Sequence, residues 1–211
     1  MLLQKMESRG LHDIHFFAKG RRGCTYTAFL KNNKNKHVMI KAEIPRLETP
    51  STISFETQWL QKMNKKKIGP KFFFAESNFL VMEFIDGILF LEYLEQKPKA
   101  VIQKVIKNLL QQMYILDQWG VNKKEMTHPH KHIIIRDDKP VLIDFERSKH
   151  TENPKNINQF VQFLTSLKVK LLLEKKDILI DQSQVLHLAK DYKEHRTIEK
   201  YQKIVEVITA S

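Results

Sequence analysis

Short apolar runs separated by polar turns occupy the first half of the chain. Aromatic and β-branched residues concentrate in runs that are typical of β-strands, whereas one segment places its apolar residues at helical spacing. The predicted strands are 13–19, 24–30, 37–44, 71–77 and 79–85, and the predicted helix is 53–64. This half of the chain is therefore expected to form a small β-rich unit with one helix.

The second half has a mainly helical pattern. Residues 100–119 carry apolar side chains at helical spacing, which predicts a helix packed in a core. Two apolar runs, 132–135 and 141–145, follow around the turn 136–140, and lysine-rich helical segments continue to residue 211. We predict an α+β fold with two lobes, a β-rich lobe over 1–85 and a helical lobe over 86–211, with a ligand cleft between them.

Charge is the strongest compositional signal. The 211 residues include 36 Lys and Arg against 24 Asp and Glu, a formal net charge of +12. Such an excess attracts polyanions, so nucleic acid is an expected partner, although lysines that only solvate the surface would give the same charge. Cys24 is the only cysteine and no apolar run approaches the length of a membrane span. These features predict a soluble, cytoplasmic protein without disulfides and without membrane contact; oligomeric state is not predicted.

Two charged residues fall inside apolar patterns. Lys41 interrupts the run HVMIKAEI, and Glu56 lies within the arc that Phe55, Trp59 and Met63 form on a helix. A buried charge needs a partner, so we expect Lys41 and Glu56 to form an ion pair. The alternative is a glutamate at the margin of the apolar stripe that reaches water.

Two segments of the first half could contact a phosphorylated ligand. The turn Gly20-Arg21-Arg22-Gly23 precedes the lysine strand by one strand, and its backbone amides and arginines could cradle phosphate. It could also be a plain hairpin connection. Residues Glu83, Phe84 and Ile85 follow a strand at the expected lobe boundary, where extended backbone can bind a flat heterocycle.

The segment 124–148 carries the remaining candidate chemistry. His128, His130 and His132 alternate along the chain, so in a strand they would share a face and could bind zinc. Pro129 disfavours a regular ladder, and no cysteine stands nearby. The strand 141–143 instead delivers Asp144 at its end, which suits a carboxylate that holds Mg²⁺ against phosphates.

These motifs occur in an order that resembles the protein kinase superfamily. The chain shows GRRG, VMIK, a helix glutamate, LVMEF and VLIDFE over about residues 13–165. The resemblance implies that Lys41, oriented by Glu56, positions the α- and β-phosphates of ATP, and that Gly20, Arg21, Arg22 and Gly23 cover them. It further implies that Glu83, Phe84 and Ile85 bind adenine.

The same resemblance assigns roles in the catalytic loop. His132 falls at the metal-binding asparagine position and Asp144 at the metal-binding aspartate, although imidazole is an unusual Mg²⁺ ligand and His132 could instead bind phosphate or Asp144. Counting back to the base position gives Thr127, which cannot accept a proton, whereas counting forward from Gly120 gives Glu125. We therefore predict Glu125 as the base, with Lys131 stabilising the transferred phosphoryl group.

The chain looks most like the minimal kinases of the Bud32 and RIO type. The stretch 125–147 is similar to a group once labelled predicted archaeal serine/threonine kinases, which includes the archaeal RNA kinase. This resemblance implies ATP- and Mg²⁺-dependent phosphorylation of a ribose 2′-hydroxyl in tRNA, at a variable-loop uridine, which would stabilise the tRNA.

Two features of the chain favour RNA over a protein acceptor. Only about ten residues separate Asp144 from the helix after Pro154, so no peptide-docking segment is present, and the basic surface suits RNA phosphates. The predicted RNA contacts are Lys65, Lys66, Lys67, Lys71, Lys123 and Lys124. The alternatives are a serine/threonine protein kinase, a Bud32-like ATPase, or a pseudokinase that binds RNA without catalysis.

Overall fold

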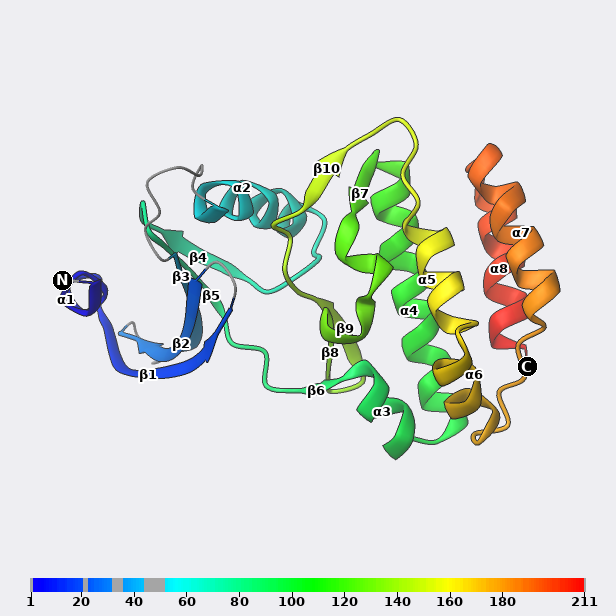
Figure 1. Ribbon diagram of the computed structural model, residues 1–211, viewed down its shortest axis with the longest axis horizontal. Helices are drawn as coiled ribbons and strands as arrows, with labels where there is room; N and C mark the ends of the chain where they lie inside the picture. The colour runs from blue at the N-terminus through cyan, green and yellow to red at the C-terminus, as the bar shows by residue number, and fades with distance from the viewer. Residues whose placement is uncertain (1, 21–22, 32–35, 44–51, 211) are drawn as a thin grey trace. The chain divides into compact units, whose positions relative to one another are not determined.

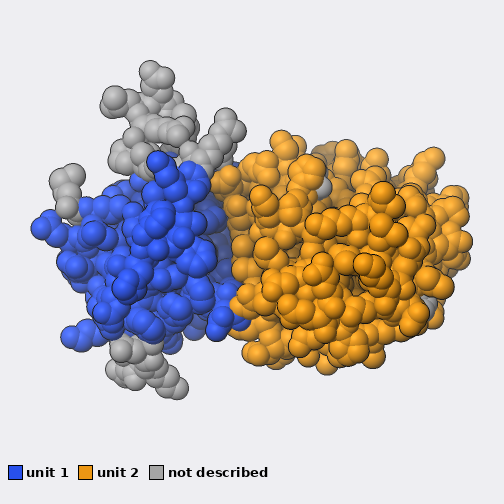
Figure 2. All heavy atoms as spheres, turned by 60° about the horizontal axis from the view of Figure 1, so that its bottom comes forward, with its two compact units in different colours: residues 1–86 blue, residues 87–211 orange. Residues whose placement is uncertain are grey.

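The computed structural model describes residues 2–20, 23–31, 36–43 and 52–210. The chain divides into two compact units, residues 1–86 and 87–211 (Figures 1 and 2). An antiparallel sheet dominates the first unit and helices dominate the second, which confirms the predicted α+β class. Within the described residues, no helix combines the length and the apolar character that a membrane span needs.

The first unit is built on a five-stranded antiparallel sheet with strand order β1-β2-β3-β5-β4. Its strands are β1 (Leu11–Lys19), β2 (Gly23–Leu30), β3 (Lys36–Glu43), β4 (Phe72–Ala75) and β5 (Phe79–Glu83). Helix α1 (Leu2–Ser8) precedes the sheet and buries Met6 in a core with residues such as Val38, Ile40 and Val81. Strand β3 is central in the sheet, which places its alternate side chains in fixed positions.

Helix α2 (Thr52–Lys65) packs against β3, β4 and β5 of the same unit. Its apolar stripe recurs at helical spacing and is buried, as the pattern of the sequence predicts. The buried residues of this stripe include Ile53, Trp59, Leu60 and Met63. Glu56 belongs to this face and is only 4% exposed, so the alternative of a solvated marginal glutamate is wrong.

The second unit is organised around the 20-residue helix α4 (Lys99–Gln118), whose buried face includes Ile102, Leu109 and Met113. Helices α5 (Asn156–Leu164) and α8 (Ile198–Thr209) pack against α4, and α7 (Gln182–Glu194) packs against α5 and α8 (Figure 1). The remaining helices are α3 (Phe90–Gln96) and α6 (Leu167–Glu174). This helical layer supports the loops that carry the candidate chemistry.

Two small sheets complete the second unit. One contains β6 (Ile88–Leu89), β8 (Ile133–Arg136) and β9 (Lys139–Leu142); the other pairs β7 (Val121–Lys123) with β10 (Ser148–His150). The β8–β9 turn places Asp137 and Asp138 at φ 49° and 56°, the backbone geometry that suits a tight hairpin. The Tyr93 hydroxyl of α3 donates to Asp138 Oδ1 at 2.7 Å, which fixes the turn against the helix.

Two short 3₁₀ helices connect β7 to β8. They are η1 (Lys124–Thr127) and η2 (Pro129–Lys131), so this segment is a turn and not a strand. The alternation of His128, His130 and His132 therefore does not place them on one strand face. Among the described residues the three imidazoles do not gather into a set of metal ligands, which argues against the zinc alternative.

Candidate active site

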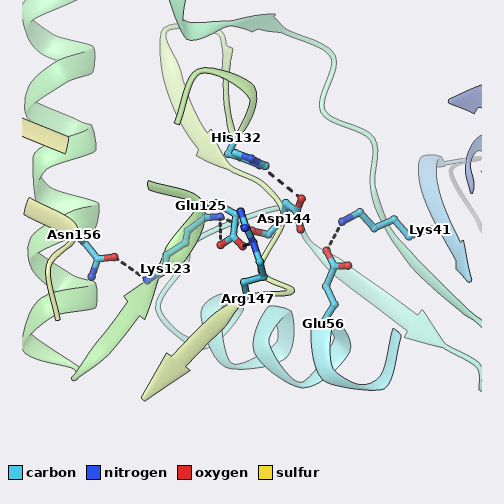
Figure 3. A network of polar contacts seen from close by, with 8 residues as sticks. All are labelled: Lys41, Glu56, Lys123, Glu125, His132, Asp144, Arg147 and Asn156. Carbon is cyan, nitrogen blue, oxygen red and sulfur yellow. Dashed lines mark hydrogen bonds and ion pairs between the residues drawn. The ribbon is translucent and has the colours of Figure 1, made fainter. Parts of the chain in front are cut away.

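The first unit contains a close ion pair between a strand and a helix. Lys41 of β3 directs its Nζ to Glu56 Oε1 of α2 at 2.6 Å (Figure 3). The Glu56 side chain is 5% exposed, whereas the Lys41 side chain is 23% exposed. The structure thus brings together the two residues whose apolar surroundings predicted a pair, and the lysine retains access to solvent.

The glycine turn between β1 and β2 closes through a backbone hydrogen bond, in which Gly20 N donates to Gly23 O at 2.8 Å. A Cβ on Gly23 would lie 2.2 Å from Ala42 O, so the close approach of β3 requires glycine there. Arg21 and Arg22 lie outside the described residues. Strand packing alone therefore explains Gly23, and its proposed phosphate contact stays a prediction.

The segment predicted to bind adenine is only partly open. Glu83 N donates to Lys71 O at 2.8 Å and Phe84 N donates to His37 O at 3.3 Å, so both amides are used within the first unit. This corrects the prediction that the Glu83 and Phe84 amides bind adenine. Ile85 keeps a backbone N–H with no backbone partner among the described residues, and its side chain is buried.

In the second unit Asp144 follows β9 with a φ of 64°, in the left-handed region that aspartate adopts at a cost. Such conformations concentrate at functional sites. Its carboxylate is 26% exposed. Oxygens of Asp144 and Glu146 lie within 4.8 Å of each other, a spacing that fits Mg²⁺ held by two carboxylates. Glu146 is not among the predicted site residues, because it stands where kinases carry glycine; its signal in the sequence is an acid two positions after Asp144.

His132 lies beside Asp144, with its Nδ1 3.7 Å from Asp144 Oδ2, too far for a hydrogen bond. Burial, together with the positive charge of Lys123, lowers the pKa of His132 to about 4, so the imidazole is neutral at neutral pH. Its Nδ1 has no hydrogen-bond partner among the described residues. Since Mg²⁺ prefers oxygen, the Asp144 and Glu146 pair fits the metal better than the predicted His132 and Asp144 pair.

Glu125 occupies a buried ionic network instead of an open catalytic position. Its Oε2 accepts from Lys123 Nζ at 3.2 Å and its Oε1 accepts from Arg147 Nε at 2.9 Å (Figure 3). The side chains of Lys123 and Glu125 are both 0% exposed. A carboxylate with both oxygens engaged and no surface cannot reach a substrate hydroxyl in this conformation, so the structure favours a positioning role over the predicted role as base.

Lys123 corrects a second prediction. The sequence predicts that it contacts RNA, but its side chain is fully buried, lies 4.8 Å from the centre of the Phe145 ring, and donates to the Asp144 carbonyl oxygen. A buried ammonium cannot bind an RNA phosphate. It instead links Glu125 to the backbone of Asp144, so the network holds the strained aspartate in place.

A second layer fixes this network to the helices. The Asn156 side chain accepts from Lys123 N at 2.9 Å and donates to Val121 O at 2.6 Å, which ties α5 to β7. Asp117 of α4 accepts from Asn156 N at 3.0 Å and from Ile157 N at 3.2 Å, at the start of α5. Burial raises the pKa of Asp117, and the hydrogen bonds from Asn156 oppose that rise.

The other predicted site residues lie at the surface. Lys131 is exposed in the turn before His132, where its proposed contact with a phosphoryl group stays a prediction. The predicted RNA contacts Lys65, Lys66, Lys67, Lys71 and Lys124 are also exposed. Exposure is compatible with RNA binding, yet Lys65 also lies in the last turn of α2, where a positive charge stabilises the helix.

Solved structures with the same fold define the class of protein. The chain matches the crystal structure of the Rio2 kinase from Chaetomium thermophilum with a TM-score of 0.59 and 12% identity, over 99% of this chain and 76% of that chain. A Rio2 kinase–ADP/Mg²⁺–phosphoaspartate complex from the same organism matches with a TM-score of 0.56 and 12% identity, over 92% and 75% of the two chains. The fold is therefore that of a RIO-type, protein-kinase-like protein.

Sequence similarity gives the family. No protein-family model matches the chain. The chain is 30% identical over 115 residues to the uncharacterized protein MJ1211 of Methanocaldococcus jannaschii, which covers 53% of this chain and 98% of that protein. The chain belongs to the family of MJ1211.

Proposed function

We propose that the protein is an ATP- and Mg²⁺-dependent kinase that phosphorylates the ribose 2′-hydroxyl of a tRNA nucleotide. The observation that carries the kinase proposal is the Lys41–Glu56 ion pair on β3 and α2 within a RIO-type fold. A lysine held by a buried glutamate presents a fixed positive charge, which suits the α- and β-phosphates of a nucleotide.

The second unit supports the proposal with a metal-binding arrangement. Asp144 and Glu146 would hold Mg²⁺, which neutralises phosphate charge when it is bound. One of the matching Rio2 structures is a complex with ADP and Mg²⁺, which agrees with such a ligand. Lys123 fixes the Asp144 backbone, so the carboxylate keeps one orientation toward its ligand. Phosphoryl transfer needs orientation more than proton removal, so a buried Glu125 does not argue against transfer.

The net charge of +12 supports RNA as the acceptor, since phosphate contacts by lysine and arginine dominate affinity for RNA. The short connection between Asp144 and α5 agrees with this choice, because the chain lacks the long segment on which protein kinases dock peptides. A variable-loop uridine is the acceptor that the sequence resemblance implies.

Incubation with γ-labelled ATP, Mg²⁺ and bulk tRNA tests the proposal. We expect label in tRNA, and mass spectrometry of the digested nucleosides should find a phosphate on a ribose 2′ oxygen. Lys41→Met and Asp144→Asn should both abolish labelling, whereas the exposed-surface variant Lys104→Gln should retain it. Label in added protein substrates with none in tRNA would overturn the RNA proposal in favour of a protein kinase.

A specific observation favours one second candidate, an ATPase that forms a phosphoaspartate. One of the matching Rio2 structures is a phosphoaspartate complex, and Asp144 here presents a partly exposed carboxylate. An Asp144 oxygen would attack the γ-phosphorus, ADP would leave, and water would then release phosphate. Hydroxylamine-labile label on Asp144 with no label in tRNA would support this ATPase. RNA binding without any transfer of label would instead indicate a pseudokinase.

A further inference from the structure

The second unit contains a hollow of about 690 Å³ that the candidate site does not use. It lies where the turn with His128 and His130 meets helices α5, α6 and α7. Its volume falls within the range of about 300–1,000 Å³ that is usual for ligand pockets. A hollow of this size beside the turn that leads to His132 is a place for part of a large substrate.

The lining of the hollow is positively charged. Lys155 precedes α5, Lys168 belongs to α6 and Lys193 to α7, and none of the described lining residues is Asp or Glu. The pKa of His130 is lowered by its burial and by nearby positive groups, which include Lys131, His128 and Lys168. Three helical elements therefore direct cations to one hollow without acidic partners in its lining, which favours an anionic ligand.

The floor of the hollow adds hydrogen-bond acceptors. Asn158 Oδ1 and Gln159 Oε1 line it, are buried and have no hydrogen-bond partner among the described residues. The Asn158 Nδ2 group donates to Ala189 O at 2.8 Å, which orients the amide so that its oxygen is the unpaired atom. Buried acceptors cost free energy unless a ligand supplies donors.

Cations together with unpaired acceptors select the chemistry of the ligand. Free phosphate or a carboxylate peptide side chain would satisfy the lysines but would offer no donor to the amide oxygens. A ribonucleotide supplies both, since its phosphate is anionic and its 2′-hydroxyl and base amino groups donate. Phe163 and Val169 give the hollow an apolar wall for a ribose or base face.

We propose that this hollow binds a ribonucleotide segment of the acceptor RNA and fixes the strand beside the catalytic turn. The proposal rests on the proposed function for the identity of the acceptor. His130 and Lys131 lie in the same short turn as His132, so a strand held in the hollow is tethered near the residues of the candidate site.

Equilibrium binding of fluorescent tRNA to the full chain, without ATP, tests the hollow. The variant Lys155→Gln/Lys168→Gln/Lys193→Gln is compared with Lys104→Gln/Lys107→Gln/Lys203→Gln, which changes the net charge equally on α4 and α8, outside the hollow. We expect the first variant to bind at least about tenfold more weakly and to lose about 2 from the slope of log K against log salt, because each single-stranded phosphate contact contributes about 0.7. We expect the second to change affinity less than about twofold. Equal loss in both variants, or no loss in the first, would overturn the proposal.

Two further measurements separate ligand classes and separate this proposal from the function. Gln159→Leu should reduce the preference for an RNA oligonucleotide over DNA of the same sequence, whereas competition by polyglutamate at equal charge as effective as competition by RNA would overturn the RNA assignment in favour of an acidic protein. If tRNA is never phosphorylated but only the hollow variant loses tRNA binding, the function fails and the hollow stands. If tRNA is phosphorylated and the hollow variant binds normally, the hollow fails alone.

Discussion

The two units each contain a lysine–glutamate pair, and the pairs differ in their access to solvent. In the first unit Lys41 meets Glu56 at 2.6 Å, and the lysine side chain is 23% exposed. In the second unit Lys123 meets Glu125 at 3.2 Å, and both side chains are 0% exposed. The same two residue types therefore form one pair that a ligand can reach and one that it cannot.

The difference shows that residue type and spacing do not decide the role of an ion pair. A partly open lysine can exchange some of its contact with glutamate for contact with phosphate. A fully buried lysine cannot leave its partners without leaving a buried charge uncompensated, so its role is to hold the backbone. The comparison predicts loss of ligand binding for changes to the first pair and loss of folding for changes to the second.

Removal of the buried carboxylate should have the largest effect on stability. Glu125→Ala leaves Lys123 as an unpaired buried charge, and we expect the free energy of unfolding of the second unit to fall by about 3–5 kcal/mol. Urea unfolding, followed by circular dichroism, measures this change. Unchanged stability together with lost phosphoryl transfer would contradict the structural role and restore Glu125 as the base.

A double variant controls for the buried pair. Lys123→Met combined with Glu125→Leu removes both charges together, and Arg147 can still reach water because its side chain is 44% exposed. We expect this variant to recover much of the lost stability, because a buried ion pair can often be replaced by apolar residues at little cost. A double variant as unstable as Glu125→Ala would show that packing, and not charge, dominates.

The support of the buried pair by α5 predicts a smaller effect that depends on pH. Asn156→Ala removes its hydrogen bonds to β7 and Asp117, and we expect a loss of about 2–3 kcal/mol at neutral pH. Those bonds hold down the pKa of Asp117, so the variant raises that pKa further. Part of the loss comes from the poorly solvated Asp117 carboxylate and should disappear as the pH falls through the raised pKa to below its unfolded value of 3.8.

Unfolding of both proteins between pH 3 and 7 measures this dependence. The difference in the free energy of unfolding between wild type and Asn156→Ala should shrink toward low pH. A matched control is Asn108→Ala on α4, which should give a difference that does not depend on pH. A pH-independent difference for Asn156→Ala would show that Asp117 does not sense the loss of its donors.

The open pair predicts a separation of binding from stability. Glu56→Gln keeps the shape of the side chain and removes its charge, so we expect a loss of only about 1–2 kcal/mol in stability. Affinity for a fluorescent ATP analogue should fall at least about tenfold, because Lys41 loses the partner that orients it. Glu76→Gln is the matched control, since Glu76 pairs with Lys5 and Arg9 in the same unit. Equal affinity in the two variants would argue against a nucleotide role for Lys41.

Strong local patterns allowed much of the fold to be predicted from the sequence. The five strands of the first unit and helices α2, α4 and α5 follow from aromatic runs and from apolar stripes at helical spacing. Short elements were missed, because β6, β7 and β10 contain only two or three residues and exist through pairing with distant strands. The chain carries little local signal for them.

The candidate site divides along the same line. Lys41 and Glu56 could be paired from the sequence, because each interrupts an apolar pattern and so demands a partner. Lys123 sits in a polar stretch beside Lys124, and only the pairing of β7 with β10 and the packing of Phe145 bury it. Glu146 was missed because it departs from the expected glycine, and its proximity to Asp144 depends on the left-handed backbone at Asp144.

The smallest expected effect concerns the third partner of Glu125. Arg147 Nε donates to Glu125 Oε1 at 2.9 Å, but its side chain is 44% exposed. Solvent-exposed ion pairs contribute little, so Arg147→Gln should lower the free energy of unfolding by about 0.2–1 kcal/mol, well below the effect of Glu125→Ala. Urea unfolding at low and high salt measures this, and the small loss should decrease further at high salt. A loss as large as that for Glu125→Ala would mean that Arg147, and not the buried Lys123, compensates the charge of Glu125.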